Sequence, residues 1–387
     1  MERMAQRGHE VRVVDFEIGW SSGPAKPRFQ GRTIFPDVQK VVEGGGLLVV
    51  RPAMVRAPVL DYMSASVSHY FEIRSQLKEF RPDVLVGFGI LNASTGIRLA
   101  RKHRIPFVYY LIDELHRLVP QPAFRRLSKL VEQANLRRST KVLSINSALQ
   151  EYTIRMGAAI SRTEVLPAGI DLNRYVSAGG SEVRQRYEFN ETDLVLFFMG
   201  WMYPFSGLRE VATAIAAAPH TAKIPKLLAV GKGELFDDLQ RVARQPNAKG
   251  RIVILPWQPY AELPQYLAAA DICILPAENV EVMQNIVPIK MYEYMAAGKP
   301  VIASRLFGLM KEFPEGRGVV YIDRPSDAVA KALELAREDC IPELGQQARL
   351  SVSGNDWEAV TDRFESLLAG LVEDARTKPF SGRQPSA

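Results

Sequence analysis

Short apolar segments alternate with longer amphipathic segments along almost the whole chain. Amphipathic segments such as Ala65–Phe80 and Ala93–His103 have the spacing of helices. Fully apolar strands separated by helices are typical of a parallel sheet covered on both faces. The expected strands form a first set and a second set: Glu10–Phe16, Leu47–Arg51, Asp83–Gly89, Pro106–Ile112, Lys141–Ile145 and Thr163–Pro167; then Leu194–Gly200, Lys226–Gly231, Arg251–Pro256, Asp271–Pro276, Pro300–Ser304 and Gly318–Ile322.

The two sets of strands predict two doubly wound, Rossmann-like domains with a cleft between them. The 387 residues are enough for about two domains, and Pro167–Ser181, rich in turn residues, separates the sets. We expect an N-terminal domain over residues 1–175 and a C-terminal domain over 176–356. An amphipathic helix over 357–375 should pack back toward the N-terminal domain, and residues 376–387 should form a disordered tail. Ligands of such sheets bind at the carboxyl ends of the strands.

The beginning of the chain departs from this pattern. The segment Met1–Phe16 has the features of the last turns of a helix, a glycine stop at Gly8 and then a strand. A Rossmann-type domain begins instead with a strand and a glycine-bearing turn. We therefore expect the first strand of the N-terminal domain to be missing from this sequence.

Composition and charge exclude several classes of protein. Apolar residues make up 47% and charged residues 24%, as in ordinary globular proteins. No segment has the length and apolarity of a membrane-spanning helix, and the two cysteines, Cys273 and Cys340, suit free thiols in a reducing cytoplasm. The net charge of +6 suits an anionic ligand without demanding nucleic acid. Six lysine and arginine side chains lie within Ala123–Lys141. This segment is either a solvated helix face or a docking face for acidic lipid headgroups.

The segment Pro288–Ser304 combines a helix start, a charged pair and a following strand. Pro288 suits the first turn of a helix, and Gly298 suits its left-handed stop. The helix then begins at the carboxyl edge of the sheet, where its free amides and dipole favour a diphosphate. Lys290 can add a positive charge, and Glu293 can accept two vicinal hydroxyls of a ribose. The alternative is a local Lys290–Glu293 ion pair on an exposed helix.

This segment resembles the signature of the retaining glycosyltransferases of family 4, also called group 1, which have the two-domain GT-B fold. Met4–Val14, Glu164–Tyr175, Leu228–Leu235 and Leu263–Pro276 resemble other parts of that family in order and spacing. The resemblance implies that Glu293 binds the donor's ribose and that Asn285 contacts the transferred sugar. The candidate donor-binding residues are Gly200, Ser206, Gly207, Gly231, Lys232, Lys290, Tyr292 and Glu293. The candidate catalytic residues are Asp113, His116 and Asn285.

The chain also departs from the family pattern. Trp201 and Ser206 stand where the family often has an arginine and a lysine that hold the phosphates. Ile112 stands in place of a histidine; Asp113 follows it and fits the pattern, and His116 could substitute one turn later. Such departures would impair activity, and nearby cations could compensate: Lys232, Lys290 and Arg305.

The resemblance implies transfer of a sugar from a nucleoside diphosphate to a glycan or lipid-linked acceptor, with retention of configuration. Because the usual proposal is front-face attack by the acceptor, no protein nucleophile is needed. No Asp-x-Asp motif occurs and the five histidines lack metal-ligand spacing, so we expect no metal cofactor. We expect a cytoplasmic protein, resting in part on the inner face of the membrane. The main alternative is a degenerate relative that binds a sugar, nucleotide or partner without catalysis; an epimerase, a dehydrogenase and a nucleic-acid-binding protein fit the sequence less well.

Overall fold

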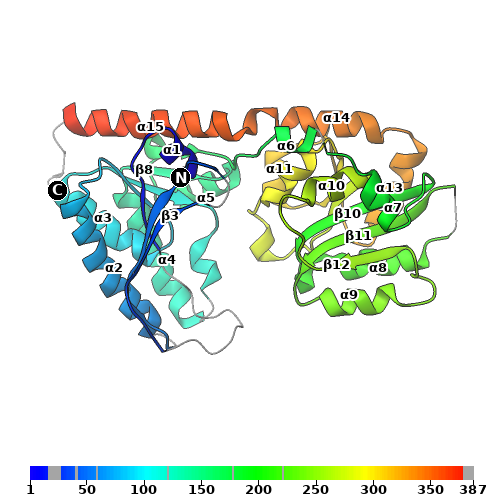
Figure 1. Cartoon of the computed structure of the whole chain (residues 1–387), viewed down its shortest axis with the longest axis horizontal. Helices are drawn as coiled ribbons and strands as arrows, with labels where there is room; N and C mark the ends of the chain where they lie inside the picture. The colour runs from blue at the N-terminus through cyan, green and yellow to red at the C-terminus, as the bar shows by residue number, and fades with distance from the viewer. Residues whose placement is uncertain are drawn as a thin grey trace. The chain divides into compact units, whose positions relative to one another are not determined.

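The computed structural model describes residues 1–15, 28–39, 42–57, 60–119, 122–176, 178–219 and 222–377. The chain divides into two compact units (Figure 1). Unit 1 comprises Met1–Ile145, Leu149–Leu166 and Val360–Ala387, and unit 2 comprises Asn146–Ala148 and Pro167–Ala359. Each unit is described by itself. Of the tail expected over residues 376–387, the first two residues end the last helix and residues 378–387 lie outside the described residues.

Unit 2 is built on one six-stranded parallel sheet. Its strand order is β12-β11-β10-β13-β14-β15, which in chain order is 3-2-1-4-5-6. All six predicted strands are present: β12, β13, β14 and β15 fall within the predicted segments, and β10 and β11 extend one or two residues beyond theirs at each end. The elements are α6 (Asn173–Val176), α7 (Ser181–Arg186), β10 (Asp193–Trp201), α8 (Leu208–Ala217), β11 (Ile224–Lys232), α9 (Phe236–Ala243), β12 (Ile252–Leu255), α10 (Leu263–Ala269), β13 (Ile272–Leu275), α11 (Ile289–Ala296), β14 (Val301–Ser304), α12 (Phe307–Glu312), β15 (Val319–Ile322), α13 (Asp327–Arg337) and α14 (Ile341–Ser351).

Successive side chains of the unit 2 strands enter two separate cores. On β10, Phe197 faces the core formed with α10, α11 and α14. Its neighbour Phe198 faces the core formed with α8, α9 and α13. This alternation explains why the strands are apolar throughout, since both faces of the sheet are covered by helices. Figure 1 shows α8 and α9 on one face of the sheet and α10 and α11 on the other.

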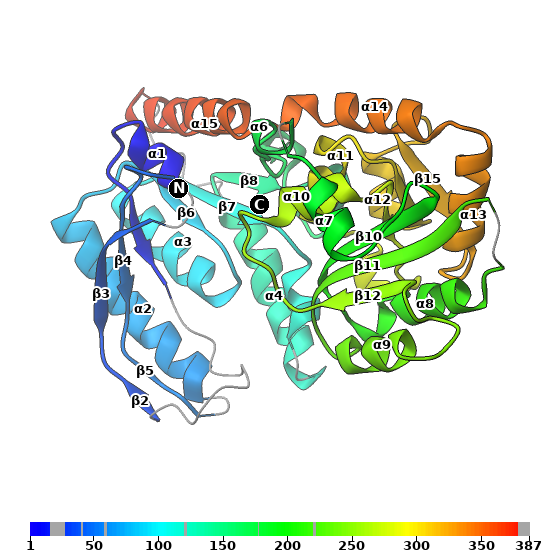
Figure 2. The ribbon, with the colours of Figure 1, turned by 45° about the vertical axis from the view of Figure 1, so that its right-hand side comes forward.

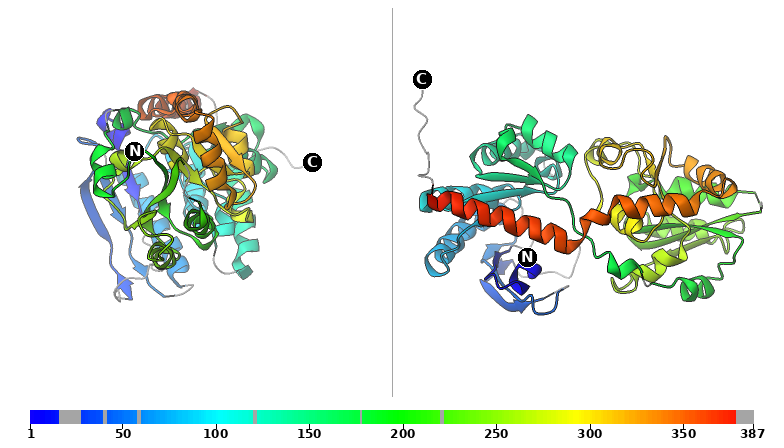
Figure 3. Two further views of the ribbon diagram at one scale, coloured as in Figure 1. Left: turned by 90° about the vertical axis from the view of Figure 1, so that its right-hand side faces the viewer. Right: turned by 90° about the horizontal axis from the view of Figure 1, so that it is seen from above.

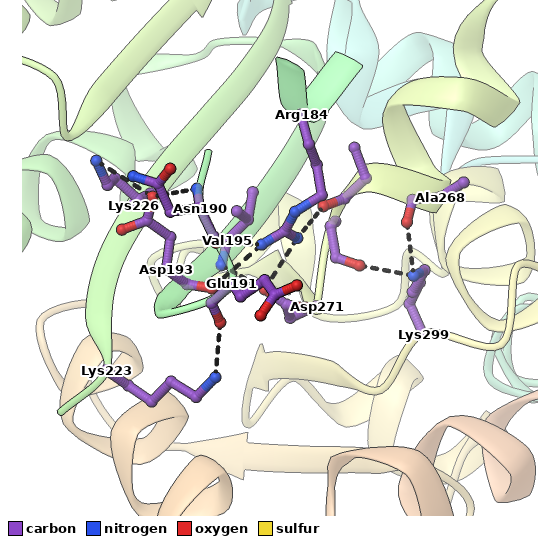
Figure 4. Close-up of polar contacts among 12 residues, drawn as sticks. Arg184, Asn190, Glu191, Asp193, Val195, Lys223, Lys226, Ala268, Asp271 and Lys299 are labelled. Atoms are coloured by element: carbon purple, nitrogen blue, oxygen red, sulfur yellow. Dashed lines mark hydrogen bonds and ion pairs between the residues drawn. The ribbon is translucent and has the colours of Figure 1, made fainter. Parts of the chain in front are cut away.

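The amino edge of the unit 2 sheet is held by a polar network (Figure 4). The carboxylate of Asp271, just before β13, accepts a hydrogen bond of 2.7 Å from the amide of Val195 on β10. Arg184 of α7 donates to the carbonyls of Ala269 and Asn190 and lies 3.5 Å from the same carboxylate. Lys299, before β14, donates to the carbonyls of Ala268 and Ala270. These contacts bond the amino ends of neighbouring strands to one another.

The described part of unit 1 contains a four-stranded sheet, a three-stranded sheet and a two-stranded sheet. The order β6-β7-β8-β9 is parallel throughout, and a separate sheet has the order β1-β4-β3. The elements are α1 (Glu2–Gln6), β1 (Arg12–Val14), β2 (Phe29–Gln30), β3 (Thr33–Val38), β4 (Leu47–Arg51), β5 (Met54–Val55), α2 (Leu60–Glu79), β6 (Leu85–Gly87), α3 (Leu91–His103), β7 (Phe107–Leu111), α4 (Pro122–Arg138), β8 (Lys141–Ser144), α5 (Ser147–Arg155) and β9 (Thr163–Val165).

The predicted strands of unit 1 are present, and three further strands, β2, β3 and β5, were not predicted. β3 runs antiparallel to β4, and β2 pairs antiparallel with β5. Most residues of β3 are exposed, so the strand lacks the continuous apolar sequence that identified the others. The remaining helix, α15 (Trp357–Thr377), contributes Val360 and Phe364 to a core on the β6–β9 sheet. The right-hand view of Figure 3 shows α15 along its length.

Candidate functional site

The strand order of unit 2 reverses between β10 and β13, so this is the point where doubly wound sheets bind ligands. The turn after β10 and the loop after β13 meet at the carboxyl edge. The amide of Glu278 in the loop donates a hydrogen bond of 2.8 Å to the carbonyl of Phe205 in the turn. The residues predicted to bind the donor lie at the end of β10, in the turn after it, at the end of β11 and on α11, which follows the loop after β13.

Backbones approach one another closely at the ends of β10 and β11. Gly200 pairs with Gly231, and a side chain at Gly231 would overlap the carbonyl of Gly200. Glycine is therefore required here by the neighbouring strand. A Cβ at Gly200 would lie 2.7 Å from Nζ of Lys290, which places the lysine against the end of β10. Lys232 ends β11 with an exposed side chain, and Gly207 precedes α8.

Helix α11 begins and ends as the sequence predicts. Pro288 is the residue before its first turn, and Gly298 follows its last turn with a left-handed φ of 68°. No side chain caps the amino end of α11. The first amides of an uncapped helix favour an anion, because they are unbonded donors at the positive end of the helix dipole.

Lys290, in the first turn of α11, has its ammonium group beside an aromatic ring. Nζ lies 4.2 Å from the centre of the Phe198 ring. Among the described residues no carboxylate forms an ion pair with Lys290, so the local pair with Glu293 is not formed. Burial lowers the pKa of Lys290 to about 8, and the charge of Glu293 offsets this only in part. A half-buried cation without an ionic partner among the described residues, at a ligand-binding edge, is what a bound anion would stabilise.

Glu293 lies one turn further along α11 and is largely buried, with 9% of its surface exposed. Its Oε1 accepts hydrogen bonds from the hydroxyls of Tyr175, at 3.1 Å, and Tyr260, at 3.2 Å. Burial raises the pKa of Glu293, while the two hydroxyls act in the opposite direction. The tyrosines fix the carboxyl group through one oxygen and leave Oε2 to accept a ligand's hydroxyls.

Two serine hydroxyls at the same edge of the sheet are buried without a hydrogen-bond partner among the described residues. They belong to Ser206, after β10, and Ser304, at the end of β14. Buried hydroxyls in proteins are normally bonded, so each is a candidate ligand contact. The structure thus brings Ser206 to the edge that also holds Gly200 and Lys290.

Other residues singled out from the sequence have different surroundings. Tyr292 is buried in the core, and its hydroxyl donates to Glu312 at 2.9 Å, so the structure does not bring it together with Lys290 and Glu293. Asn285, in the loop after β13, has its backbone carbonyl 3.4 Å from Nδ2 of Asn146. Arg305 follows β14 and forms ion pairs with Glu315 and Asp323. Trp201 donates its indole N–H to Glu234 at 2.8 Å.

The candidate catalytic residues of unit 1 follow the carboxyl end of β7. Asp113 is partly exposed, and burial raises the pKa of its carboxyl group. His116 is buried beside Glu132 of α4: Nδ1 lies 2.9 Å from Oε2 of Glu132, and the amide of His116 donates to the same oxygen. The hydroxyl of Tyr152 donates to Oε1 of Glu132 at 3.1 Å and lies 2.9 Å from Nδ1.

The His116 ring is therefore oriented through one nitrogen. Burial lowers the pKa of His116 and raises the pKa of Glu132 to about 7. In this buried cluster of His116, Glu132 and Tyr152, the imidazole of His116 is thus most stable in its neutral form. Glu132 and Tyr152 hold Nδ1, which leaves Nε2 as the nitrogen that can exchange a proton with a ligand.

Sequence reasoning missed the residues that hold the candidate side chains. Tyr175 and Tyr260 lie 118 and 33 residues from Glu293 in the chain, and Glu132 and Tyr152 lie 16 and 36 residues from His116. No spacing rule connects such pairs. A partial signal existed for Glu132, the single acidic residue in the basic segment Ala123–Lys141. Over the described ranges, no three His, Cys, Asp or Glu side chains are grouped closely enough to hold a metal ion.

Comparison with known proteins gives matches in both halves of the chain. The family model described as "Glycosyl transferase 4-like domain" matches residues 1–169, and that described as "Glycosyl transferases group 1" matches residues 181–351. A D-inositol 3-phosphate glycosyltransferase of Geodermatophilus obscurus is 25% identical over 267 residues, which cover 66% of this chain and 57% of that protein. The chain thus spans less than two thirds of the length of that relative.

Solved structures of similar fold include two that cover most of the chain. Sucrose-phosphate synthase from Thermosynechococcus elongatus has a TM-score of 0.73 at 18% identity, covering 96% of this chain and 91% of its own. HepE of Anabaena, solved in complex with UDP-glucose, has a TM-score of 0.65 at 17% identity, covering 83% of this chain and 86% of its own. At these identities the similarity concerns the fold, which is the GT-B type predicted from the sequence.

Proposed function

Since the chain belongs to the group 1 glycosyltransferases with a glycosyl transferase 4-like N-terminal part, we propose that it transfers a sugar from a nucleoside diphosphate to a glycan or lipid-linked acceptor. One observation carries the proposal: Lys290 without an ionic partner and Glu293 oriented by two tyrosines lie one turn apart on α11. A ribose needs a group that accepts hydrogen bonds from its hydroxyls, which Glu293 can supply. A diphosphate needs a cation, which Lys290 can supply.

The diphosphate would lie at the amino end of α11. There the helix amides, Lys290 and the hydroxyl of Ser206 can donate to its oxygens. Negative charge grows on the diphosphate as the sugar's anomeric bond breaks, and preorganised donors of this kind are the main source of catalysis, worth about 3–4 kcal/mol each. These side chains supply the charge, so we propose that no metal cofactor is needed.

We propose that the acceptor attacks on the face from which the diphosphate leaves, so that the anomeric configuration is retained. Such a reaction needs no covalent intermediate with the protein. Asp113 and Nε2 of His116 in unit 1 are the proposed groups that receive the acceptor's proton, and Asn285 is proposed to contact the transferred sugar. The inositol phosphate relative and the UDP-glucose complex of HepE are consistent with a sugar nucleotide donor and a hydroxyl acceptor.

The proposal is tested by calorimetry with UDP and GDP and by a screen of sugar nucleotides for hydrolysis and transfer. Glu293→Ala should abolish nucleotide binding while the melting temperature changes by only a few degrees. Unchanged binding by this variant would show that Glu293 does not hold the ribose. Nucleotide binding by the native protein with no turnover of any donor would favour the alternative of a non-catalytic binding protein.

We further propose that the protein is cytoplasmic and rests on an anionic membrane surface through α4. The first half of this helix exposes large apolar side chains between basic ones, and Leu127 and Leu130 are 59% and 62% exposed. Apolar and cationic groups together are typical of interfacial helices. None of the described helices is both long and apolar enough to cross a bilayer. The side chains concerned are Phe124, Arg125, Arg126, Leu127, Lys129 and Leu130.

Flotation with vesicles tests this surface. Binding should be strong with vesicles containing an anionic lipid and weak with neutral vesicles, and a variant with Arg125→Glu and Arg126→Glu should stay unbound. Because both arginines are exposed, the variant should fold as the native protein does. Equal flotation with neutral and anionic vesicles would argue against a role for these charges.

A further inference from the structure

The turn after β10 exposes aromatic side chains at the ligand-binding edge of unit 2. Trp201 ends β10 and Tyr203 follows it, with 40% and 44% of their surfaces exposed. Phe205, two residues further along, is half-buried. Because β10 and β11 are parallel neighbours, the turns that follow them lie at the same edge of the sheet (Figure 2). Large apolar side chains exposed singly are common on protein surfaces, whereas adjacent ones mark interaction sites.

The three rings contact one another in sequence. The ring centres of Trp201 and Tyr203 lie 6.1 Å apart with their planes tilted by 42°. The rings of Tyr203 and Phe205 are stacked, with centres 4.9 Å apart and planes at 8°. Such contacts stabilise the orientation of each ring. Trp201, Tyr203 and Phe205, which we call the aromatic turn, therefore form one aromatic surface.

The backbone of the aromatic turn is held on two sides. The amide of the buried Met202 donates a hydrogen bond of 2.7 Å to the carbonyl of Lys232. Gly233 approaches Met202 so closely that a Cβ at this glycine would lie 2.5 Å from the Met202 carbonyl oxygen. On the other side, the carbonyl of Phe205 accepts a hydrogen bond from the amide of Glu278. A ligand of the aromatic turn would therefore lose little affinity to the ordering of the protein.

Charged groups flank the Trp201 ring. Its indole N–H donates to Oε2 of Glu234 at 2.8 Å, which leaves Oε1 to accept hydrogen bonds from a ligand. Lys232 pairs with Trp201 in the sheet register, and its exposed ammonium group forms no ion pair within the described ranges of the chain. A sugar ring suits such a surface. Its carbon-bound hydrogens are attracted to the negative face of an aromatic ring, and its hydroxyls bond to the charged groups at the edge.

The proposed reaction indicates which sugar would lie here. Gly200 directly precedes Trp201, and Nζ of Lys290 lies against Gly200, so the aromatic turn adjoins the proposed diphosphate site. An acceptor that attacks on the face from which the diphosphate leaves must place its hydroxyl beside the diphosphate. The ribose is instead held one turn further along α11, at Glu293. The acceptor is therefore the substrate that the aromatic turn would contact.

Resting on the proposed function, we propose that the aromatic turn is an acceptor-binding site and that the acceptor presents a six-membered sugar ring. This ring stacks on Trp201, and its hydroxyls bond to Glu234 and Lys232. The site selects an acceptor that ends in a pyranose, free or lipid-linked, over one that ends in an acyclic alcohol or a lipid phosphate. The carboxylate of Glu234 beside the indole opposes contact with an anionic membrane, so the aromatic turn is assigned to a sugar and not to a bilayer.

The test measures binding of the methyl pyranosides of glucose, galactose and mannose to the full chain, with and without UDP. Sorbitol is the control ligand, since it has hydroxyls but no ring. In NMR, saturation of the protein's aromatic hydrogens should reach the hydrogens on one face of the bound pyranoside more than those on the other. This measurement needs no variant.

Variants of Trp201 then identify the ring. Trp201→Leu should weaken pyranoside binding at least about 10-fold, while Trp201→Tyr, which keeps a flat ring, should weaken it less than about 3-fold. Both variants should bind UDP as the native protein does. The matched control is Trp257→Leu, which removes a tryptophan that is 51% exposed in the loop after β12 and should leave pyranoside binding unchanged.

Several results would overturn the proposal. They are equal binding of sorbitol and the pyranosides, no binding of any pyranoside, and unchanged pyranoside binding by Trp201→Leu. Loss of UDP affinity in Trp201→Leu would place the indole at the nucleotide instead. Weaker binding of a sugar nucleotide with unchanged binding of UDP would place it at the donor's sugar. If the native chain binds no UDP but binds pyranosides through Trp201, the sugar site stands and the proposed transfer reaction fails.

Discussion

Lys290→Met should make unit 2 more stable and nucleotide binding weaker. The native lysine is held at the end of β10 with its ammonium near Phe198 and no ionic partner among the described residues. Methionine fills a similar volume without a charge, so it removes the cost of burying the cation. A gain in stability together with a loss of binding distinguishes a ligand contact from a structural residue.

The size of the gain follows from the pKa of Lys290. A fall from 10.5 to about 8 corresponds to about 3 kcal/mol. The side chain is partly exposed, which reduces this value through solvent screening, and the cation–ring contact is lost as well. We therefore expect about 1–2 kcal/mol of stabilisation at pH 7, which raises the melting temperature by about 3–6 °C. The diphosphate should lose one charge-assisted hydrogen bond, so UDP should bind about 10- to 100-fold more weakly.

The pH dependence gives a second measure. Because the pKa of Lys290 is lowered in the folded state, the folded protein releases its proton first, and native stability rises as the pH increases from about 8 toward 10.5. The difference between variant and native protein should be largest below pH 8 and shrink above it. Thermal unfolding from pH 7 to pH 10 and calorimetry with UDP and uridine measure these effects. The control is Lys249→Met, since this exposed lysine lies in the turn before β12. A variant that melts below the native protein at pH 7 and binds UDP unchanged would refute the reasoning.

Three further predictions concern the hydrogen-bonded groups. Tyr260→Phe removes one donor to Oε1 of Glu293, so UDP and uridine should both bind about 3- to 10-fold more weakly in calorimetry, whereas loss of UDP binding alone would place the tyrosine elsewhere. Glu132→Gln should remove a pH dependence of stability that the native protein has. Burial raises the pKa of Glu132 to about 7, so the stability of the native protein falls as the pH rises from 4.5 through 7. Urea unfolding at pH 5 and pH 8 should show that the native protein loses about 2 kcal/mol relative to the variant between these pH values. A constant difference between those pH values would contradict it. Asp271→Ala leaves the amide of Val195 without its acceptor and removes the carboxylate beside Arg184, so the free energy of unfolding should fall by about 2–3 kcal/mol with UDP affinity unchanged.

The strands of unit 2 could be predicted because of their position in the fold. Central strands of a parallel sheet are buried on both faces, so apolar residues fill them without interruption, as on β10 and β13. The bounds of α11 were equally accessible, since Pro288 and Gly298 act through local backbone geometry. In contrast, β3 is mostly exposed and antiparallel to its neighbour, so its residues carry no such signal.

The site was predictable in part. Helix geometry places Lys290 and Glu293 one turn apart, and this much follows from the sequence. That Lys290 lies beside Phe198, and that Tyr175 and Tyr260 hold Glu293, depends on how strands and loops distant in the chain come together. The same limit applies to Tyr292. Lys290 and Glu293 on the same helix are candidate site residues, but the side chain of Tyr292 packs in the core.

The polar network around Asp271 and Arg184 has a consequence for engineering donor choice (Figure 4). The network holds the sheet at the end opposite to the loops that follow β10 and β13. The residues that stabilise the sheet of unit 2 and the loops proposed to bind the donor are therefore separate segments of the sequence. Libraries that randomise residues 203–205 and 278–286 and keep the buried residues Met202, Gly207 and Val287 should therefore yield mostly folded proteins. Selection among them can then act on which sugar nucleotide is accepted.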